Sequence, residues 1–339
     1  MKIKFFQFHP HTLFSNGGGE AIFKNVISEL KHIGVDVSIY DIQSRNSSGF
    51  EIFHLFGSNN SVSEIYQPIV LAGKKLVVSA IDYSDMNFFK LKLYKFFQKY
   101  YIFPNVYKYR QKLFSASSII IANSKPEKTF LLDYFDIDKN KIVVIPVGVS
   151  SKFYNNKTKS FVEKYNLKKY ILCVGRINSR KGQIKVINSL RSLSINIVFI
   201  GESDPSEPVY FKKFEELVKT TEGIYWVGQL KHDSDLLISA YSNALLHVLP
   251  SNPPEFPGIS SMEAGLAGTK VVTTYTDALG DTFKDYAYYC KSTEESILHT
   301  VNDALKAEDN KILSNHLYNN FVWEKLIEKY VLEYKKLVK

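Results

Sequence analysis

Short apolar segments alternate with helical stretches along nearly the whole chain, and this alternation restricts the fold more than any other feature. The predicted strands of the first half are Ile3–Phe8, Val35–Tyr40, Glu51–Phe56, Lys75–Ala80, Ser117–Ala122 and Lys141–Pro146. Those of the second half are Tyr170–Val174, Ile195–Ile200, Ile224–Val227, Leu245–Leu249, Lys270–Thr273 and Ala287–Cys290. Strands that alternate with helices form parallel sheets, because each connection is a crossover. We therefore predict an α/β protein of two doubly wound, Rossmann-like domains facing each other across a cleft.

The chain has 339 residues, which is enough for two domains with separate cores. The polar stretch 150–169 is predicted to be the linker between them, which gives domains over residues 1–152 and 153–320. Two cysteines are too few for a disulfide framework, the N-terminal apolar run is too short for a signal peptide, and no stretch has the length of a membrane-spanning helix. We therefore expect a cytoplasmic protein. A formal charge of +9 favours an anionic partner.

The stretch Leu249–Gly268 contains the strongest candidate binding site. Its prolines exclude regular structure until a helix can begin near Gly258. The free N–H groups at a helix N-terminus suit a phosphate. Glu255 and Glu263 lie on either side of that helix start, and their carboxylates can accept hydrogen bonds from sugar hydroxyls, so the stretch suits a nucleotide sugar. The alternative is an ordinary helix start with incidental surface glutamates.

Basic residues and glycines follow other strands of the second half. Arg176 and Lys181 stand in the first loop, where two cations are well placed to bind a diphosphate; a solvated basic loop is the alternative. Gly201 and Gly228 each follow a strand, where a base or ribose could approach the backbone. The acidic residues of Asp233–Asp235 are predicted to start a helix rather than to bind a metal ion.

In the first half, Gly17, Gly18 and Gly19 lie between the first strand and a helix from Glu20. A third glycine needed for a dinucleotide-binding fingerprint is replaced by Ile22, which disfavours NAD; a plain tight turn remains possible. Asp82 directly follows the apolar run 76–81 and should reach the floor of the cleft, unless it only caps the next turn. His54 is a second candidate on that side.

The segment Asn87–Leu113 has seven basic residues and no acidic one. Aromatic and aliphatic side chains share one helical face, and Lys92, Lys95 and Lys99 lie on another. Such a helix suits the surface of an anionic membrane. Two alternatives are a core role for the aromatic face and binding of single-stranded nucleic acid; the latter is disfavoured because no RNA-binding motif accompanies the segment.

Several motifs in order resemble glycosyltransferase family 4, the retaining nucleotide-sugar transferases of GT-B fold. They are GGGE at 17–20, ANS at 122–124, KIVVIPVGV at 141–149, VGRINSRKG at 174–182, LPS at 249–251 and EFPGISSME at 255–263. The last is the most specific, because Glu255 and Glu263 match the glutamate pair of the family. The closing stretch resembles the terminal helices of the family, which implies that residues 321–339 pack back on the first domain.

The resemblance implies a role for each matching residue. Arg176 and Lys181 would bind the donor diphosphate, Glu255 the transferred sugar, and Glu263 the ribose. The backbone at Pro257, Gly258 and Ile259 would reach the sugar and phosphates, and Gly17 and Gly18 would let the first domain approach the diphosphate. No metal ion or other cofactor is expected. Many members have a histidine at the position of Asp82, so its role in handling the acceptor proton stays open.

The sequence thus predicts a retaining, metal-independent hexosyltransferase with a nucleotide-sugar donor, most simply UDP-linked. A saccharide or lipid-linked acceptor is expected, in lipopolysaccharide or exopolysaccharide synthesis, with the enzyme peripheral at the inner face of the membrane and no nucleic-acid partner. The alternatives are a nucleotide-sugar epimerase or hydrolase of the same fold and a non-catalytic partner subunit.

Overall fold

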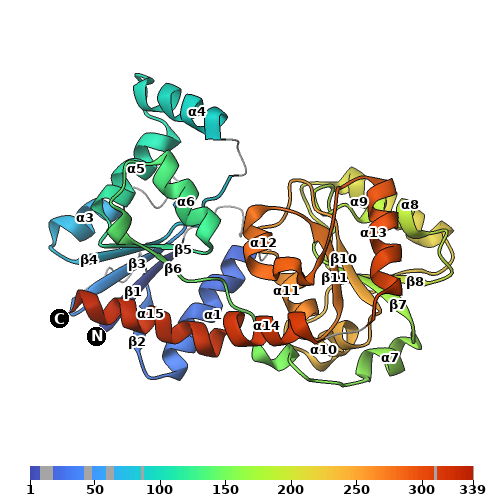
Figure 1. The fold of residues 1–339 in the computed structure, drawn as a ribbon. Coiled ribbons are helices and arrows are strands. Elements are labelled where there is room, and N and C mark those ends of the chain that lie inside the picture. Colours follow the sequence, from blue (N-terminus) through green and yellow to red (C-terminus); the bar gives the residue numbers. More distant parts are fainter. Residues whose placement is uncertain (8–17, 42–47, 59–64, 85–87, 309–310, 339) are drawn as a thin grey trace. The chain divides into compact units, whose positions relative to one another are not determined.

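The computed structural model describes residues 1–7, 18–41, 48–58, 65–84, 88–308 and 311–338. The chain divides into two compact units, one formed by Met1–Gly148 with Trp323–Lys339 and the other by Val149–Val322. Each unit contains one sheet of six parallel strands with helices on both faces (Figure 1). The predicted pair of Rossmann-like domains is therefore confirmed.

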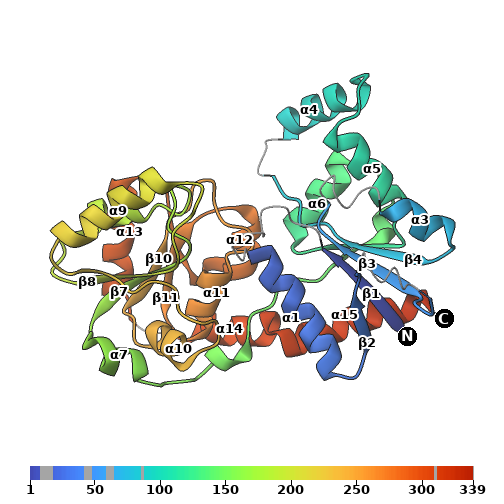
Figure 2. The ribbon, with the colours of Figure 1, turned by 180° about the vertical axis from the view of Figure 1, so that it is seen from behind.

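The first unit has the strand order β2-β1-β3-β4-β5-β6. These strands are β1 (Lys2–Gln7), β2 (Asp36–Ile39), β3 (Ile52–Phe56), β4 (Lys75–Ser79), β5 (Ile119–Ala122) and β6 (Ile142–Val144). Helices α1 (Gly18–His32) and α15 (Trp323–Leu337) cover one face, and α3 (Tyr66–Leu71), α5 (Val106–Ala116) and α6 (Lys125–Tyr134) cover the other (Figures 1 and 2). All four central strands carry buried apolar side chains on both faces, as parallel strands between two helix layers require.

The second unit has the order β12-β11-β10-β7-β8-β9. Its strands are β7 (Tyr170–Val174), β8 (Asn196–Ile200), β9 (Ile224–Trp226), β10 (Leu246–Leu249), β11 (Lys270–Thr274) and β12 (Tyr288–Cys290). Its helices are α7 (Ser160–Tyr165), α8 (Gln183–Leu190), α9 (Pro208–Thr220), α10 (Asp235–Ser242), α11 (Ile259–Leu266), α12 (Asp277–Phe283), α13 (Glu294–Lys306) and α14 (Ile312–Phe321). One apolar cluster packs the sheet against α8, α9 and α13, and another packs it against α7, α10, α11 and α14.

The stretch 150–169 is not the linker that its polar composition predicted. Phe153 and Phe161 are fully buried in the core of the second unit, and residues 160–165 form α7. The chain passes between the units earlier, at Val149, whose backbone N–H donates to the carbonyl of Phe321 at 2.8 Å. The second unit therefore begins at Val149 and ends at Val322, a few residues outside the predicted range 153–320. A few aromatic residues among many polar ones were sufficient to make this stretch part of a core.

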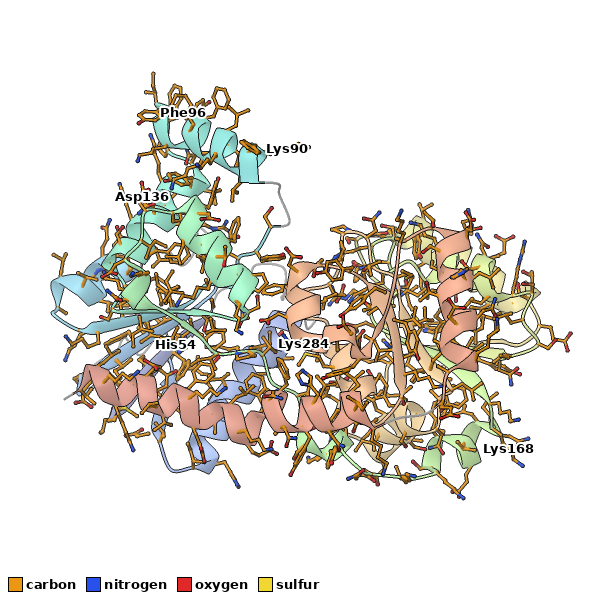
Figure 3. All side chains as sticks on the ribbon, in the orientation of Figure 1. His54, Lys90, Phe96, Asp136, Lys168 and Lys284 are labelled. Carbon is orange, nitrogen blue, oxygen red and sulfur yellow. The ribbon has the colours of Figure 1, made fainter. Side chains whose placement is uncertain are left out.

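Helix α15 packs on the first unit along an apolar stripe of Trp323, Leu326, Ile327, Tyr330 and Tyr334. The hydroxyl of Tyr334 lies 2.7 Å from Nδ1 of His54, and Nε2 of His54 lies 2.9 Å from the Ser79 hydroxyl. Burial lowers the pKa of His54 to about 3, so this imidazole is neutral. His54, which was the alternative to Asp82, is a fully buried core residue beneath α15 (Figure 3). Among the residues described here, none of the helices combines the length and the apolar character needed to cross a membrane.

We predict that Tyr334→Phe destabilises the first unit by about 1–3 kcal/mol, because it leaves a buried imidazole nitrogen without its partner. Thermal or urea unfolding measures the effect, and Tyr225→Phe, at a side chain that is 41% exposed, is the control. Equal stability of the two variants would show that the His54 contact contributes nothing.

Candidate active site

The carboxyl ends of β7 and β10 meet at the point where the second sheet changes direction. The strands are neighbours, but the chain continues from β7 to β8 on one side and from β10 to β11 on the other. In open parallel sheets, ligands bind at such a switch point because the two following loops diverge there. The loop after β7 contains Arg176 and Lys181, and the loop after β10 contains Glu255 and Gly258.

Backbone and side-chain hydrogen bonds hold these two loops together. The N–H of Asn252 donates to the carbonyl of Arg180 at 2.7 Å, which joins the loops directly. Within the first loop, the N–H of Lys181 donates to Oδ1 of Asn178 at 3.0 Å, and the Gln183 amide donates to the carbonyl of Arg176 at 2.8 Å. The loops are therefore preorganised, and their charged side chains project from a fixed backbone.

Glu255 is the centre of a charged cluster at this switch point. Its Oε2 lies 2.5 Å from Nζ of Lys181, and its Oε1 lies 3.2 Å from Nη2 of Arg180. Burial alone would raise the pKa of Glu255, but Lys181 and Arg180 outweigh it and hold the pKa below its ordinary value. The cluster is thus two cations around one ionised carboxylate, and it retains one net positive charge.

Helix α11 begins beside this cluster. Its N-cap residue is Gly258, which lies in the left-handed region at φ 75°. No side chain forms a capping hydrogen bond at this helix start. A Cβ at Gly258 would lie 3.1 Å from Leu279, so a larger residue would also disturb the packing. Pro257 precedes this cap, and Ile259 is the first helical residue. The first-turn N–H groups of α11 therefore carry no side-chain cap and add partial positive charge beside Lys181 and Arg180.

Glu263 lies in the second turn of α11 and is only 4% exposed. The Tyr241 hydroxyl donates to its Oε2 at 2.9 Å, and Nε2 of His232 lies 2.8 Å from its Oε1. The hydrogen bond to Glu263 raises the pKa of His232, while burial raises the pKa of Tyr241 well above its ordinary value. The carboxylate is thus oriented by two donors, and each oxygen has a further lone pair to offer a ligand.

The remaining predicted residues of the second unit have different surroundings. The guanidinium of Arg176 faces Glu202 and Asp204, at 3.9 and 4.0 Å, and not Glu255. Gly201 packs against β7, because a Cβ there would overlap the carbonyl oxygen of Gly175. A Cβ at Gly228, where φ is 74°, would meet open space. The structure therefore brings Lys181, Glu255 and the start of α11 together.

Asp82 lies in the first unit, at the carboxyl end of β4, in an unusual backbone setting. The preceding Ile81 has φ 46°, which is strained for a β-branched residue. Oδ2 of Asp82 lies 2.7 Å from Nη1 of Arg110, and its backbone N–H donates to Oε1 of Glu127 at 2.7 Å. Burial raises the pKa of Asp82, and Arg110 opposes that shift. Such strain and pKa perturbation together are typical of functional sites.

Glu127 is fully buried and joins the ends of two strands in the same unit. Besides Asp82 after β4, it accepts a hydrogen bond from the backbone N–H of Asn123 after β5. Burial raises the pKa of Glu127 to about 8. The switch point of this sheet lies between β1 and β3. Helix α1 follows β1 and begins at Gly18, whereas Gly17 lies outside the described residues.

Sequence reasoning missed two residues of the site in the second unit. Arg180 directly precedes Lys181, and the prediction chose only Arg176 and Lys181 from that loop. His232 was not predicted, because the interpretation of its loop used only the acidic residues that follow it. Of these, Asp235 does begin α10, and Ser234 caps that helix. A histidine in the loop that follows a strand end was the available signal for His232.

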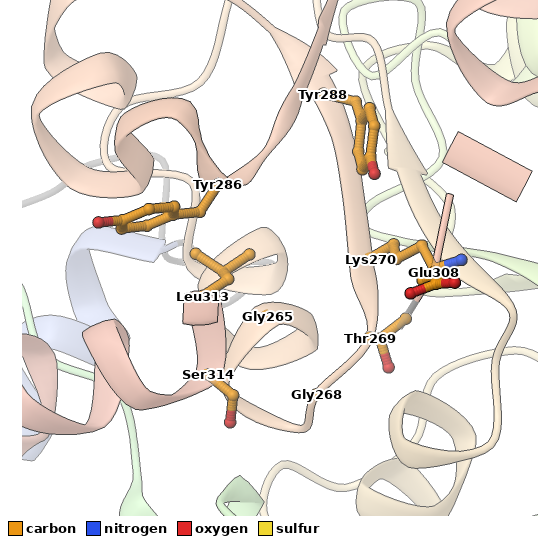
Figure 4. Close-up of a pocket in the computed structure, with 9 residues that line it drawn as sticks. All are labelled: Gly265, Gly268, Thr269, Lys270, Tyr286, Tyr288, Glu308, Leu313 and Ser314. Carbon is orange, nitrogen blue, oxygen red and sulfur yellow. The ribbon is translucent and has the colours of Figure 1, made fainter. Parts of the chain in front are cut away.

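The second unit also contains a pocket that none of these site residues lines (Figure 4). Its lining residues are Gly265, Gly268, Thr269, Lys270, Tyr286, Tyr288, Glu308, Leu313 and Ser314. Lys270 is the first residue of β11, so the pocket lies at the amino ends of the strands. Its ammonium group already binds the carbonyls of Ala304 and Ala307, at 3.1 and 2.6 Å. The site at the switch point is therefore the better candidate.

We predict that His232→Gln makes stability less dependent on pH. Because the folded pKa of His232 lies above 6.5, its stabilising effect is complete below pH 6.5 and is lost as pH rises through the raised value. The side chain is 49% exposed, so the expected difference from the unaltered protein is at most about 1 kcal/mol in acid and near zero in alkali. Thermal unfolding over a pH series tests this, with the exposed His299→Gln as control; a difference that grows with pH would contradict it.

Known proteins share this fold. Residues 155–321 match the family model described as "Glycosyl transferases group 1". Sucrose-phosphate synthase from Thermosynechococcus elongatus superposes with a TM-score of 0.78 at 15% identity, over 100% of this chain and 99% of that one. HepE of Anabaena, in complex with UDP, gives 0.77 at 14% over 99% and 100%. The catalytic domain of starch synthase IV from Arabidopsis thaliana, bound to ADP and acarbose, gives 0.67 at 13% over 99% of each chain.

A search of curated proteins gave no match. The structural similarities lie at low identity and establish the fold, whereas the family model covers nearly all of the second unit. The resemblance indicated by the sequence motifs is thus confirmed. The second unit therefore belongs to the group 1 glycosyltransferases, and the chain as a whole has the GT-B fold.

Proposed function

We propose that the chain is a retaining, metal-independent hexosyltransferase that uses a nucleotide sugar, with UDP as its nucleotide. The observation that carries the proposal is the cluster of Lys181, Arg180 and Glu255 beside the uncapped start of α11. It combines positive charge for a diphosphate with a carboxylate for sugar hydroxyls at a topological switch point. HepE, a protein of the same fold, has been solved with UDP and with UDP-glucose, which supports the choice of nucleotide.

In the donor complex, the diphosphate would lie against the first turn of α11. Lys181 and Arg180 would then exchange part of their contact with Glu255 for the phosphate oxygens, while Arg176 would approach from the same loop. Glu255, released from one cation, would accept hydrogen bonds from the hydroxyls of the transferred sugar. Glu263, oriented by Tyr241 and His232, would accept from the ribose hydroxyls.

During transfer, the bond between the anomeric carbon and the phosphate oxygen breaks, and an acceptor oxygen bonds to that carbon on the same face. Negative charge develops on the leaving phosphate, where the helix start and the cations stabilise it without a metal ion. The acceptor hydroxyl gives its proton to a departing phosphate oxygen, and attack from the face that the phosphate leaves retains the anomeric configuration. Asp82, which follows the strained Ile81 and pairs with Arg110, would orient the acceptor in the first unit.

The acceptor class in this proposal is a saccharide or lipid-linked saccharide, used in cell-surface glycan synthesis such as that of lipopolysaccharide or exopolysaccharide. The enzyme would work in the cytoplasm at the inner face of the membrane. Support comes from the first unit, where Asn87–Leu113 combines basic residues with exposed aromatic side chains. Hydrolysis or epimerisation of the donor would need the same donor site, so product analysis distinguishes these activities from transfer.

We predict that Lys181→Ala and Glu263→Ala each lower kcat/KM at least about a hundredfold, because each removes a charged contact to the donor. Lys168→Ala, at an exposed lysine on the same unit, is the matched control (Figure 3). Thermal unfolding of each variant checks that the fold survives. Turnover at the level of the control would remove the donor-site assignment.

A screen of radiolabelled nucleotide sugars identifies the donor and tests the activity itself. We expect one UDP-sugar to give a labelled glycoside, with unchanged rates in EDTA and retained anomeric configuration by NMR. If the products are free sugar or an epimer, with no glycoside, the activity is hydrolysis or epimerisation of the donor and not transfer. A thermal-shift panel in which no nucleoside diphosphate raises the Tm would instead indicate a non-catalytic subunit.

A further inference from the structure

Helix α4 (Phe88–Tyr100) and the turn after it bear a continuous set of exposed apolar side chains. Within the first unit, α4 projects beyond α5 and α6 in both views (Figures 1 and 2). We call this set the aromatic ridge; each member is at least 56% exposed, and the members are Phe89, Leu93, Phe96, Phe97, Tyr100, Tyr101, Ile102 and Phe103. Exposure of this many neighbouring apolar groups is unusual for a surface that contacts only water. The aromatic face is therefore not core, which was the alternative considered from the sequence.

The opposite side of α4 anchors the helix to its own unit. Leu91 is only 5% exposed, and the ring of Tyr94 stacks on that of Tyr134 in α6. Lys95 and Lys99 reach Asp136, with Nζ to oxygen distances of 3.0 and 2.8 Å. Figure 3 shows Phe96 on the side of α4 away from Asp136. Two of the lysines expected to face a membrane thus belong to the anchor, and they fix the direction of the ridge.

The charge around the ridge indicates which partner it fits. Lys90 and Lys92 are exposed on the same helix, and the segment 87–113 contains no acidic residue. Tyr100 and Tyr101 add aromatic rings with polar tips, which favour the boundary between lipid headgroups and acyl chains. A face with this pattern gains both from burial of apolar area and from attraction to anionic headgroups.

We propose that the aromatic ridge inserts into the interface of an anionic lipid bilayer and docks the first unit there. Insertion of Phe97, Ile102 and Phe103 provides most of the affinity, and Lys90 and Lys92 provide the preference for anionic lipid. This docking rests on the proposed function in one respect: it would bring the lipid-linked acceptor of that function within reach of the enzyme.

The test is co-sedimentation of the full chain with vesicles of phosphatidylcholine mixed with an equal part of phosphatidylglycerol. The triple variant F97S/I102S/F103S should bind at least about tenfold more weakly, because it removes three large inserted side chains. The matched controls are Leu71→Ser in the first unit and Val209→Ser in the second, whose side chains are 87% and 82% exposed but lie outside the ridge. Both controls should bind like the unaltered protein.

The double variant K90Q/K92Q tests the electrostatic part. We expect it to lose the preference for the mixed vesicles over pure phosphatidylcholine, as the unaltered protein should in high salt. Unchanged vesicle binding by the triple variant would overturn the proposal. So would a protein that ignores vesicles but forms a dimer that the triple variant dissociates in analytical ultracentrifugation, since the ridge would then bind a second copy.

Stabilisation by UDP separates this inference from the proposed function. The triple variant should retain the thermal shift that UDP produces, because the ridge lies in the first unit and the donor residues in the second. Loss of vesicle binding with the UDP shift intact supports the ridge as a docking surface. A protein that binds vesicles through the ridge but shows no shift with any nucleotide would defeat the donor assignment and leave the docking surface standing.

Discussion

The ion pair between Lys181 and Glu255 is the contact on which the candidate site depends. It joins the loops of two neighbouring strands, and it keeps a carboxylate ionised although that carboxylate is largely buried. A buried carboxylate and a buried ammonium group are each unfavourable alone, so the unliganded site is stable only while the two are paired. In the proposed donor complex, a diphosphate would take over only part of the contacts of these cations, so that Glu255 would keep a cation beside it.

The first unit also has side chains that join the ends of its strands. Glu127 collects the backbone N–H groups at the ends of β4 and β5, and Arg110 joins Asp82 to the carbonyl of Ser58 after β3. Three strand ends are thereby connected by the buried Glu127 and the half-buried Arg110. In both units, polar side chains at the strand ends hold the loops at the carboxyl edge of the sheet in place.

The strands, and the loops in which the candidate site residues lie, could be predicted from the sequence. A buried parallel strand is a short apolar run, and the loop after it carries the polar residues. Partners could not. Arg180 and Lys181 are adjacent in the chain, and only the tertiary structure shows that both contact Glu255 while Arg176 turns toward Glu202. The linker prediction was wrong for a related reason. The composition of the stretch is polar on average, but two of its residues, Phe153 and Phe161, are buried in the core. Exposure of the aromatic ridge was likewise undecidable, since an amphipathic helix has the same pattern whether its apolar face meets a core or a membrane.

The return of α15 to the first unit has a consequence for biosynthesis. The second unit is continuous in the chain, so all of its residues have been synthesised before the last helix is made. The first unit is discontinuous: Tyr330 and Tyr334, which complete its core around His54, are synthesised only after the whole of the second unit. The first unit therefore cannot complete its core before the second unit has been made, and a truncation between Val322 and α15 would damage the first unit while leaving the second unit whole.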